Sequence, residues 1–123
     1  MRKEKLITVG IIVFILLVAG GVIYLKSTSF SIKDFPAEEV AKYIGEHSTL
    51  YVQTGCIHCK EQEDLFGSNV KYLNIIDCIS SSENTQLCTD AGIEGTPTWI
   101  INGEKYAGVL SIEKLKELTG YQG

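Results

Sequence analysis

The chain has 123 residues, of which 45% are hydrophobic and 21% are charged, and its formal net charge at pH 7 is −4. These fractions are ordinary for a globular protein and exclude a mainly disordered chain, while the length allows one small domain rather than two. Beyond Lys26 there are seven lysines and no arginine against fourteen Asp and Glu residues. Such an acidic surface argues against a nucleic-acid partner, because phosphate groups would be repelled.

Leu6–Leu25 is an apolar segment long enough to cross a membrane. Its twenty residues carry no charge, and as a helix they would rise about 30 Å, which matches the hydrocarbon thickness of a bilayer. We therefore expect a single-pass transmembrane anchor at residues 6–25. A cleaved signal peptide is the alternative, because Ala19, Gly20 and Gly21 are small, but the apolar run is longer than a usual signal core.

The charges before this segment predict its orientation. Arg2, Lys3 and Lys5 stand against a single Glu4, and an excess of positive charge favours the cytoplasmic side. We therefore expect residues 1–5 to form a cytoplasmic tail, and the domain after the anchor to lie outside the cytoplasm at the cell membrane.

A short connecting segment precedes the predicted domain. Residues 26–35 are interpreted as a linker or as a first strand built on Phe30 and Ile32, and residues 36–123 as the domain itself.

Helices and strands alternate through the first part of this domain. The predicted elements, in chain order, are a helix at Pro36–Gly45, a strand at Thr49–Thr54, a helix at Cys56–Phe66, a strand at Lys71–Asp77 and a helix at Glu83–Ala91. Leu87 is expected to turn inward from the last of these helices. The two strands, with a helix between them, imply a parallel crossover.

A hairpin and a helix are expected to complete the domain. The runs Thr98–Ile101 and Lys105–Val109 flank Asn102-Gly103, which is the commonest signature of a two-residue hairpin turn. After it, a helix is predicted with Ser111 as its N-cap, Ile112, Leu115 and Leu118 on its apolar face, and Gly120 at its end. The chain is therefore expected to form an α/β domain whose mixed central sheet is flanked by helices.

Cys56 and Cys59 carry the clearest chemical signal. A Cys-x-x-Cys at the start of a helix places the first sulfur at unpaired backbone N–H groups and at the positive end of the helix dipole, which favours the thiolate. The second sulfur lies one turn along and can resolve a mixed disulfide. His58, between them, would stabilise the thiolate further as an imidazolium, so the pair is expected to be oxidising. An exposed His58 that touches nothing is the simpler interpretation.

Thr96-Pro97 is the third element of the predicted site. A proline just before a strand, after Gly92 and Gly95, favours a cis peptide bond, with an ordinary trans loop as the alternative. The strand and helix between Cys59 and Pro97 are long enough to return the proline to the cysteines.

These residues resemble the thioredoxin superfamily. Thr54–Lys60 (Thr-Gly-Cys-Ile-His-Cys-Lys), Gly92–Thr98 and the Asn102-Gly103 turn match, in order, the active site, the cis-proline loop and the hairpin of that superfamily, and the likeness extends over Pro36–Gly120. The resemblance implies a thioredoxin fold after a single N-terminal transmembrane helix. It also implies that Cys56 and Cys59 are the redox pair.

The chain looks most similar to thioredoxin-like domains that are fused to, or partnered with, bacterial and archaeal homologues of vitamin K epoxide reductase. That resemblance implies the oxidation of exported thiol-containing client proteins and the transfer of their electrons to a quinone-linked membrane partner. We expect no cofactor and no metal, because the redox-active disulfide itself carries the electrons.

The chain departs from cytoplasmic thioredoxin in two respects. It lacks the aromatic residue before the first cysteine, and Leu50 stands where the preceding strand of thioredoxin carries a buried Asp. A histidine in the dipeptide is characteristic of the more oxidising members. A disulfide reductase or isomerase of the same fold remains an alternative.

Cys78 and Cys88 form a second pair with wider spacing. A similar second cysteine pair occurs in the thioredoxin-like domains that the chain resembles. If they are bridged, they close a loop of eleven residues, which would stabilise the domain by roughly 3 kcal/mol. A structural disulfide and a shuttle that exchanges with Cys56 and Cys59 are both open. Outside redox chemistry, a zinc-binding module and a redox-inactive adaptor are the remaining alternatives, although the second pair is wide for zinc.

Overall fold

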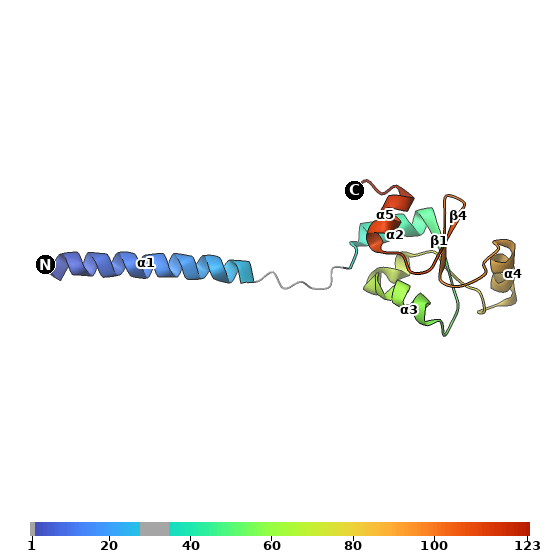
Figure 1. Cartoon of the computed structure of the whole chain (residues 1–123), viewed down its shortest axis with the longest axis horizontal. Coiled ribbons are helices and arrows are strands. Elements are labelled where there is room, and N and C mark those ends of the chain that lie inside the picture. Colours follow the sequence, from blue (N-terminus) through green and yellow to red (C-terminus); the bar gives the residue numbers. More distant parts are fainter. Residues whose placement is uncertain (1, 28–34) are drawn as a thin grey trace. The chain divides into compact units, whose positions relative to one another are not determined.

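The computed structural model describes residues 2–27 and 35–123, and the chain divides into two compact units, 1–34 and 35–123 (Figure 1). The first contains helix α1, Arg2–Ser27. Its segment Arg2–Val22 is the one helix among the described residues that is long and apolar enough to cross a membrane, a test that a signal sequence also passes. The strand proposed around Phe30 and Ile32 lies outside the described residues.

The second unit is built on a four-stranded sheet with the order β2-β1-β3-β4. The strands are β1 (Ser48–Val52), β2 (Ile75–Asp77), β3 (Thr98–Ile101) and β4 (Glu104–Ala107). β1 runs parallel to β2 and antiparallel to β3, and β3 runs antiparallel to β4. A central strand with a parallel neighbour on one side and an antiparallel hairpin on the other is the thioredoxin arrangement, so the expected mixed sheet is confirmed.

Four α-helices and one 3₁₀ helix accompany these strands in the second unit. They are α2 (Glu38–His47), α3 (Ile57–Asp64), the 3₁₀ helix η1 (Gly67–Tyr72), α4 (Ser82–Asp90) and α5 (Ile112–Thr119). Side chains from α2, α3 and α5 form one hydrophobic core together with Leu50 and Trp99 of the sheet. Helix α4 contacts β2.

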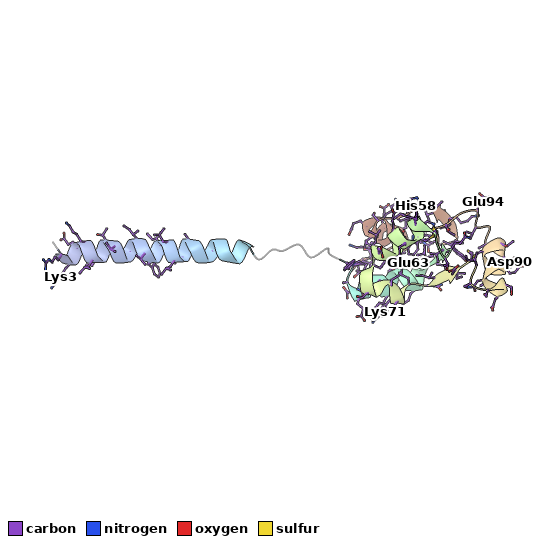
Figure 2. All side chains as sticks on the ribbon, turned by 90° about the horizontal axis from the view of Figure 1, so that it is seen from below. Lys3, His58, Glu63, Lys71, Asp90 and Glu94 are labelled. Carbon is purple, nitrogen blue, oxygen red and sulfur yellow. A yellow bond between two sulfur atoms is a disulfide. The ribbon has the colours of Figure 1, made fainter. Side chains whose placement is uncertain are left out.

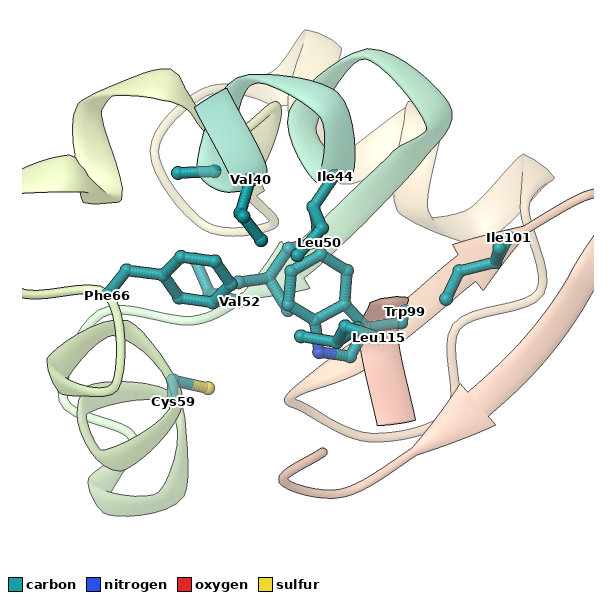
Figure 3. Close-up of a cluster of buried hydrophobic side chains, with 10 residues drawn as sticks. Val40, Ile44, Leu50, Val52, Cys59, Phe66, Trp99, Ile101 and Leu115 are labelled. Carbon is teal, nitrogen blue, oxygen red and sulfur yellow. The ribbon is translucent and has the colours of Figure 1, made fainter. Parts of the chain in front are cut away.

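The core consists of large apolar side chains from the sheet and from these helices (Figure 3). Leu50 and Trp99 are paired across β1 and β3, and Ile44, Phe66 and Leu115 cover them; all five are almost completely buried. Burying such side chains contributes roughly 1.5–3 kcal/mol each. This core holds the start of α3 at the carboxyl end of β1, which is where the cysteine motif lies.

The hairpin and the final helix agree with the local sequence signals. Asn102 and Gly103 both have positive φ (52° and 78°), as a type I′ turn requires. The Ser111 side chain accepts a hydrogen bond from the Lys114 N–H, and Gly120 adopts the left-handed conformation that ends α5.

Three expectations about the first half of the domain are wrong. Gly45 does not end its helix, because α2 continues to His47 and Gly45 is packed against the carbonyl of Tyr72, where a Cβ would not fit. The stretch Lys71–Asp77 is a strand only from Ile75, because its first residues belong to η1. Leu87 is 43% exposed, and the side chain that α4 buries is Cys88.

Candidate active site at the start of helix α3

Cys56 is placed by a tight connection between β1 and α3. After β1 ends at Val52, Gly55 takes a positive φ of 87°, and the Cys56 N–H donates to the carbonyl of Gln53 at 3.0 Å. Cys56 is then the N-cap of α3, and its sulfur accepts a hydrogen bond from the N–H of Cys59 at 3.2 Å. The sulfur thus caps an N–H group that the helix leaves unpaired.

The two cysteines form a disulfide, with their Cα atoms 5.2 Å apart. They differ in their surroundings. Cys56 is partly exposed, whereas Cys59 is 3% exposed, and its sulfur is directed toward the core side chains (Figure 3). Only Cys56 is therefore open to attack by a thiolate from another protein.

The loop before β3 brings Thr96 against the first cysteine. The hydroxyl Oγ1 of Thr96 and its carbonyl oxygen both lie 3.6 Å from the sulfur of Cys56. The Thr96–Pro97 peptide bond is cis, and the carbonyl of Pro97 accepts a hydrogen bond from the N–H of Gly108 at 2.8 Å. The fold therefore brings Thr96, and with it the cis Thr96–Pro97 bond, against the sulfur of Cys56.

His58 lies in the dipeptide but its ring is engaged elsewhere. Its Nδ1 is 2.9 Å from a carboxylate oxygen of Glu61, and the side chain is 72% exposed (Figure 2). In this disulfide form, the described contacts of His58 therefore join it to Glu61 and not to the sulfur of Cys56.

Cys78 and Cys88 form the second disulfide, with Cα atoms 5.8 Å apart. It ties the segment after β2 to α4, where the Thr85 hydroxyl donates to the carbonyl of Cys78 at 2.7 Å. A groove of about 220 Å³ is lined by this disulfide and by the cis-proline loop, including Thr96. The second pair therefore lies close to the site.

Asp77 is a residue that the sequence analysis did not single out. At the end of β2, its carboxylate accepts hydrogen bonds from the hydroxyl of Thr54 and from the N–H of Ile79, the latter at 3.0 Å. These hydrogen bonds, that of Thr54 above all, hold the pKa of the Asp77 carboxyl below its usual value. Asp77 thus joins the turn before Cys56 to the segment that carries Cys78.

Gln62 was also missed, and it fixes α3 to the rest of the domain. Its side chain is 0% exposed. Its Oε1 accepts hydrogen bonds from Trp99 Nε1 at 2.9 Å and from the Leu110 N–H at 2.7 Å, while its Nε2 donates to the Leu110 carbonyl at 3.0 Å. The sequence signal for this role is a polar residue three positions after Cys59, on the helix face that is expected to be buried. A buried amide must find hydrogen-bond partners.

The cysteines open into a groove on one side of α3. It has a volume of about 410 Å³, and its lining includes Cys56, Cys59, Lys60, Glu63 and Asp77. We call it the cysteine groove.

Metal ligation has no geometric support in the part of the chain that the structure describes. No group of three or more His, Cys, Asp or Glu side chains there is arranged to hold an ion, and all four cysteines are paired as disulfides. What the arrangement can do is exchange the Cys56–Cys59 disulfide with thiols.

Comparisons with known proteins find a sequence relative that is named for redox chemistry. No family model matches the sequence. The chain is 37% identical over 78 residues to thiol-disulfide oxidoreductase LTO1 of Arabidopsis thaliana, a match that covers 58% of this chain and 21% of that protein. The chain thus spans about a fifth of the length of this relative. Among solved structures, oxidised glutaredoxin 2 of Chlamydomonas reinhardtii matches with a TM-score of 0.44 and 18% identity, over 67% of this chain and 91% of that one.

Proposed function

We propose that the chain is a membrane-anchored thiol–disulfide oxidoreductase that introduces disulfides into exported proteins. One observation carries the proposal: the partly exposed sulfur of Cys56 receives the N–H of Cys59 at 3.2 Å and the hydroxyl of Thr96 at 3.6 Å, at the start of a helix. Both donors and the helix dipole stabilise a thiolate. The similarity to a relative named as a thiol-disulfide oxidoreductase supports the same activity.

The reaction follows from the difference between the two cysteines. A thiolate of the client attacks the exposed sulfur of Cys56, the disulfide opens, and Cys59 leaves as the reduced partner. A second client thiolate then attacks the client sulfur of the mixed disulfide and expels the Cys56 thiolate. The client gains a disulfide, and the enzyme keeps the electron pair as two thiols.

The direction of flow follows from the stability of the released thiolate. A well-stabilised thiolate at Cys56 favours the reduced enzyme, so the Cys56–Cys59 disulfide is readily reduced and is a strong oxidant of client thiols. The carbonyl of Thr96, also 3.6 Å from the sulfur, acts in the opposite direction because it would accept a hydrogen bond from the S–H of a neutral thiol. Two donors and a helix terminus act against this single acceptor, and the net effect favours the oxidase.

The membrane segment defines the proposed place of action. α1 would hold the domain at the outer face of the cell membrane with the N-terminus in the cytoplasm. Regeneration of the Cys56–Cys59 disulfide requires an electron acceptor, for which we propose a quinone-linked membrane protein similar to vitamin K epoxide reductase.

The activity is tested by mixing the oxidised full chain in liposomes with reduced, unfolded ribonuclease and measuring the disulfides formed. Wild type should transfer one disulfide per chain, and Cys56→Ser should transfer none. If Cys78→Ala/Cys88→Ala retains transfer while folded, the second pair is structural; if it loses transfer while folded, the pair is a shuttle. A folded Cys56→Ser chain that transfers as wild type does would contradict the proposal.

The alternatives predict different readings in the same preparation. A glutathione titration that gives a potential near that of thioredoxin, about −270 mV, would favour a reductase. Bound zinc at one ion per chain would favour the metal module, and client binding without any disulfide transfer would favour the adaptor.

A further inference from the structure

Cys59 needs a proton partner that its immediate surroundings do not provide. It belongs to the buried cluster that also contains Val52, Phe66 and Trp99. Burial among apolar groups disfavours the thiolate, so reduced Cys59 holds its proton at neutral pH. The proton must leave before Cys59 can attack a mixed disulfide, and it must return when Cys59 is the leaving group. Leu50, 0% exposed, occupies the strand position where a thioredoxin carries a buried acid.

The cysteine groove offers two carboxylates, Glu63 and Asp77. The volume of about 410 Å³ is large enough to hold several water molecules, each of which occupies about 30 Å³ in the liquid. A carboxylate in this groove can therefore reach Cys59 directly or through water.

Asp77 is poorly suited to accept a proton. Its two carboxylate oxygens are occupied by the hydroxyl of Thr54 and the N–H of Ile79. Because these hydrogen bonds hold its pKa low, the Asp77 carboxylate is a weaker base than an ordinary aspartate.

Glu63 does not have this restriction. It lies four residues after Cys59 on α3, so the two side chains share one face of the helix. Helical side chains lean toward the N-terminus, which directs Glu63 back over the turn that carries Cys59. None of the ion pairs within residues 35–123 involves Glu63, and its neighbour Lys60 is paired with Asp64.

We propose that Glu63 is the proton-transfer residue of Cys59, exchanging a proton with its sulfur directly or through water in the cysteine groove. The inference rests on the redox function proposed above. When a client thiolate opens the Cys56–Cys59 disulfide, the Glu63 carboxylate takes up a proton from solvent in the cysteine groove, passes it to the departing Cys59 thiolate and is a carboxylate again. In the reverse step, the Glu63 carboxylate removes the proton from Cys59, whose sulfur then attacks Cys56 and expels the client thiolate.

The other charged groups near the groove are already engaged. Lys60 is bound to Asp64, and on η1, which packs against α3, the Lys71 ammonium lies 5.1 Å from the ring centre of Tyr72. Asp77 keeps its negative charge over the working pH range. Glu63 is thus left as the carboxylate of the cysteine groove that can exchange a proton with Cys59.

The test uses the full chain in detergent, with Cys56 and Cys59 reduced and the Cys78–Cys88 disulfide intact, mixed rapidly with excess dithiobis(nitrobenzoic acid). The first release of nitrothiobenzoate reports attack by Cys56. The second reports attack by Cys59 on the resulting mixed disulfide. The two phases of one trace therefore separate the reactivity of Cys56 from the proton transfer of Cys59.

Glu63→Gln should slow the second phase at least tenfold near pH 7, a conservative figure beside the roughly 10²–10⁴-fold typical of general acid–base catalysis, and leave the first phase within about twofold. The gap should close at high pH, where Cys59 ionises unaided. Glu63→Asp should retain most of the rate, and imidazole buffer should restore the Glu63→Gln rate. Glu113→Gln, which removes the same charge from exposed α5, should match wild type.

The opposite results have distinct meanings. If Glu63 acted only through its negative charge, removing it would favour the Cys59 thiolate and speed the second phase. An unchanged or faster second phase in Glu63→Gln therefore overturns the proposal. A first phase that is slow in the wild type would instead count against the redox function itself.

Discussion

Replacement of Gln62 by methionine should destabilise the domain strongly, because one buried amide satisfies three polar groups. Methionine has nearly the same length and removes all three hydrogen bonds. Trp99 is 1% exposed, so its N–H would be left without a partner at a cost of about 1–3 kcal/mol. Leu110 is only partly buried, so its two backbone groups can turn to water, and we assign each a loss of about 0.5–1.5 kcal/mol.

Together the three lost hydrogen bonds, partly offset by the apolar packing of methionine, predict a loss of roughly 3 kcal/mol in the free energy of unfolding. Urea titration of the full chain in detergent, followed by circular dichroism, measures it. With a slope near 1 kcal/mol per molar urea, the midpoint should fall by about 3 M. Gln86→Met is the matched control, since Gln86 is exposed on α4, and it should change stability by less than about 0.5 kcal/mol.

A double-mutant cycle isolates the hydrogen bond to Trp99. Trp99→Phe removes the donor and part of the packing, so Gln62→Met should cost less in that background, by about 1–2 kcal/mol. If the losses of the two single variants add up to the loss of the double variant within about 0.3 kcal/mol, the reasoning is refuted. The hydrogen bond between Gln62 and the Trp99 N–H would then contribute nothing measurable to stability.

Three further predictions concern the site. Cys78→Ala/Cys88→Ala should lower the melting temperature by about 10–20 °C in calorimetry, because a bridge over this loop contributes roughly 3 kcal/mol; a change below about 3 °C would contradict a stabilising disulfide. Thr96→Val should raise the pH at which reduced Cys56 becomes reactive to iodoacetamide, since a donor to the thiolate is lost, and an unchanged profile would exclude that role. The lowered pKa of Asp77 contributes stability above the ordinary aspartate value of about 3.9, and that contribution is lost as pH falls through the lowered pKa. In denaturation from pH 3 to 7, Asp77→Asn should therefore be less stable than wild type near pH 6 and approach it at pH 3; a constant difference would contradict the assignment.

Features set by neighbouring residues in the sequence could be predicted. The Asn102-Gly103 turn, the Ser111 cap and the Gly120 end depend on contacts within a few residues, and each agrees with the structure. The Cys-x-x-Cys start of α3 belongs to the same class, because a sulfur at an N-cap needs only the next turn of its own helix.

Features that depend on contacts between distant parts of the chain could not be predicted from the sequence. The local sequence predicts a helix end at Gly45, but the role of Gly45 depends on the carbonyl of Tyr72, which η1 brings against α2. The fully buried Gln62 depends on Trp99 and Leu110, and Asp77 depends on Thr54 across the sheet. The contact between His58 and Glu61 likewise depends on the conformation of both side chains, which the spacing of residues in the sequence does not determine.

The rate at which reduced Cys56 is alkylated, measured from pH 4 to 9 with mass analysis of the labelled residue, tests the account most directly. The full chain is used with its Cys78–Cys88 disulfide intact. We predict that Cys56 reacts first and reaches half of its maximal rate well below the value of about 8.5 that is ordinary for a cysteine. A midpoint at that ordinary value, or no labelling of Cys56 at neutral pH in the folded protein, would contradict the proposed chemistry.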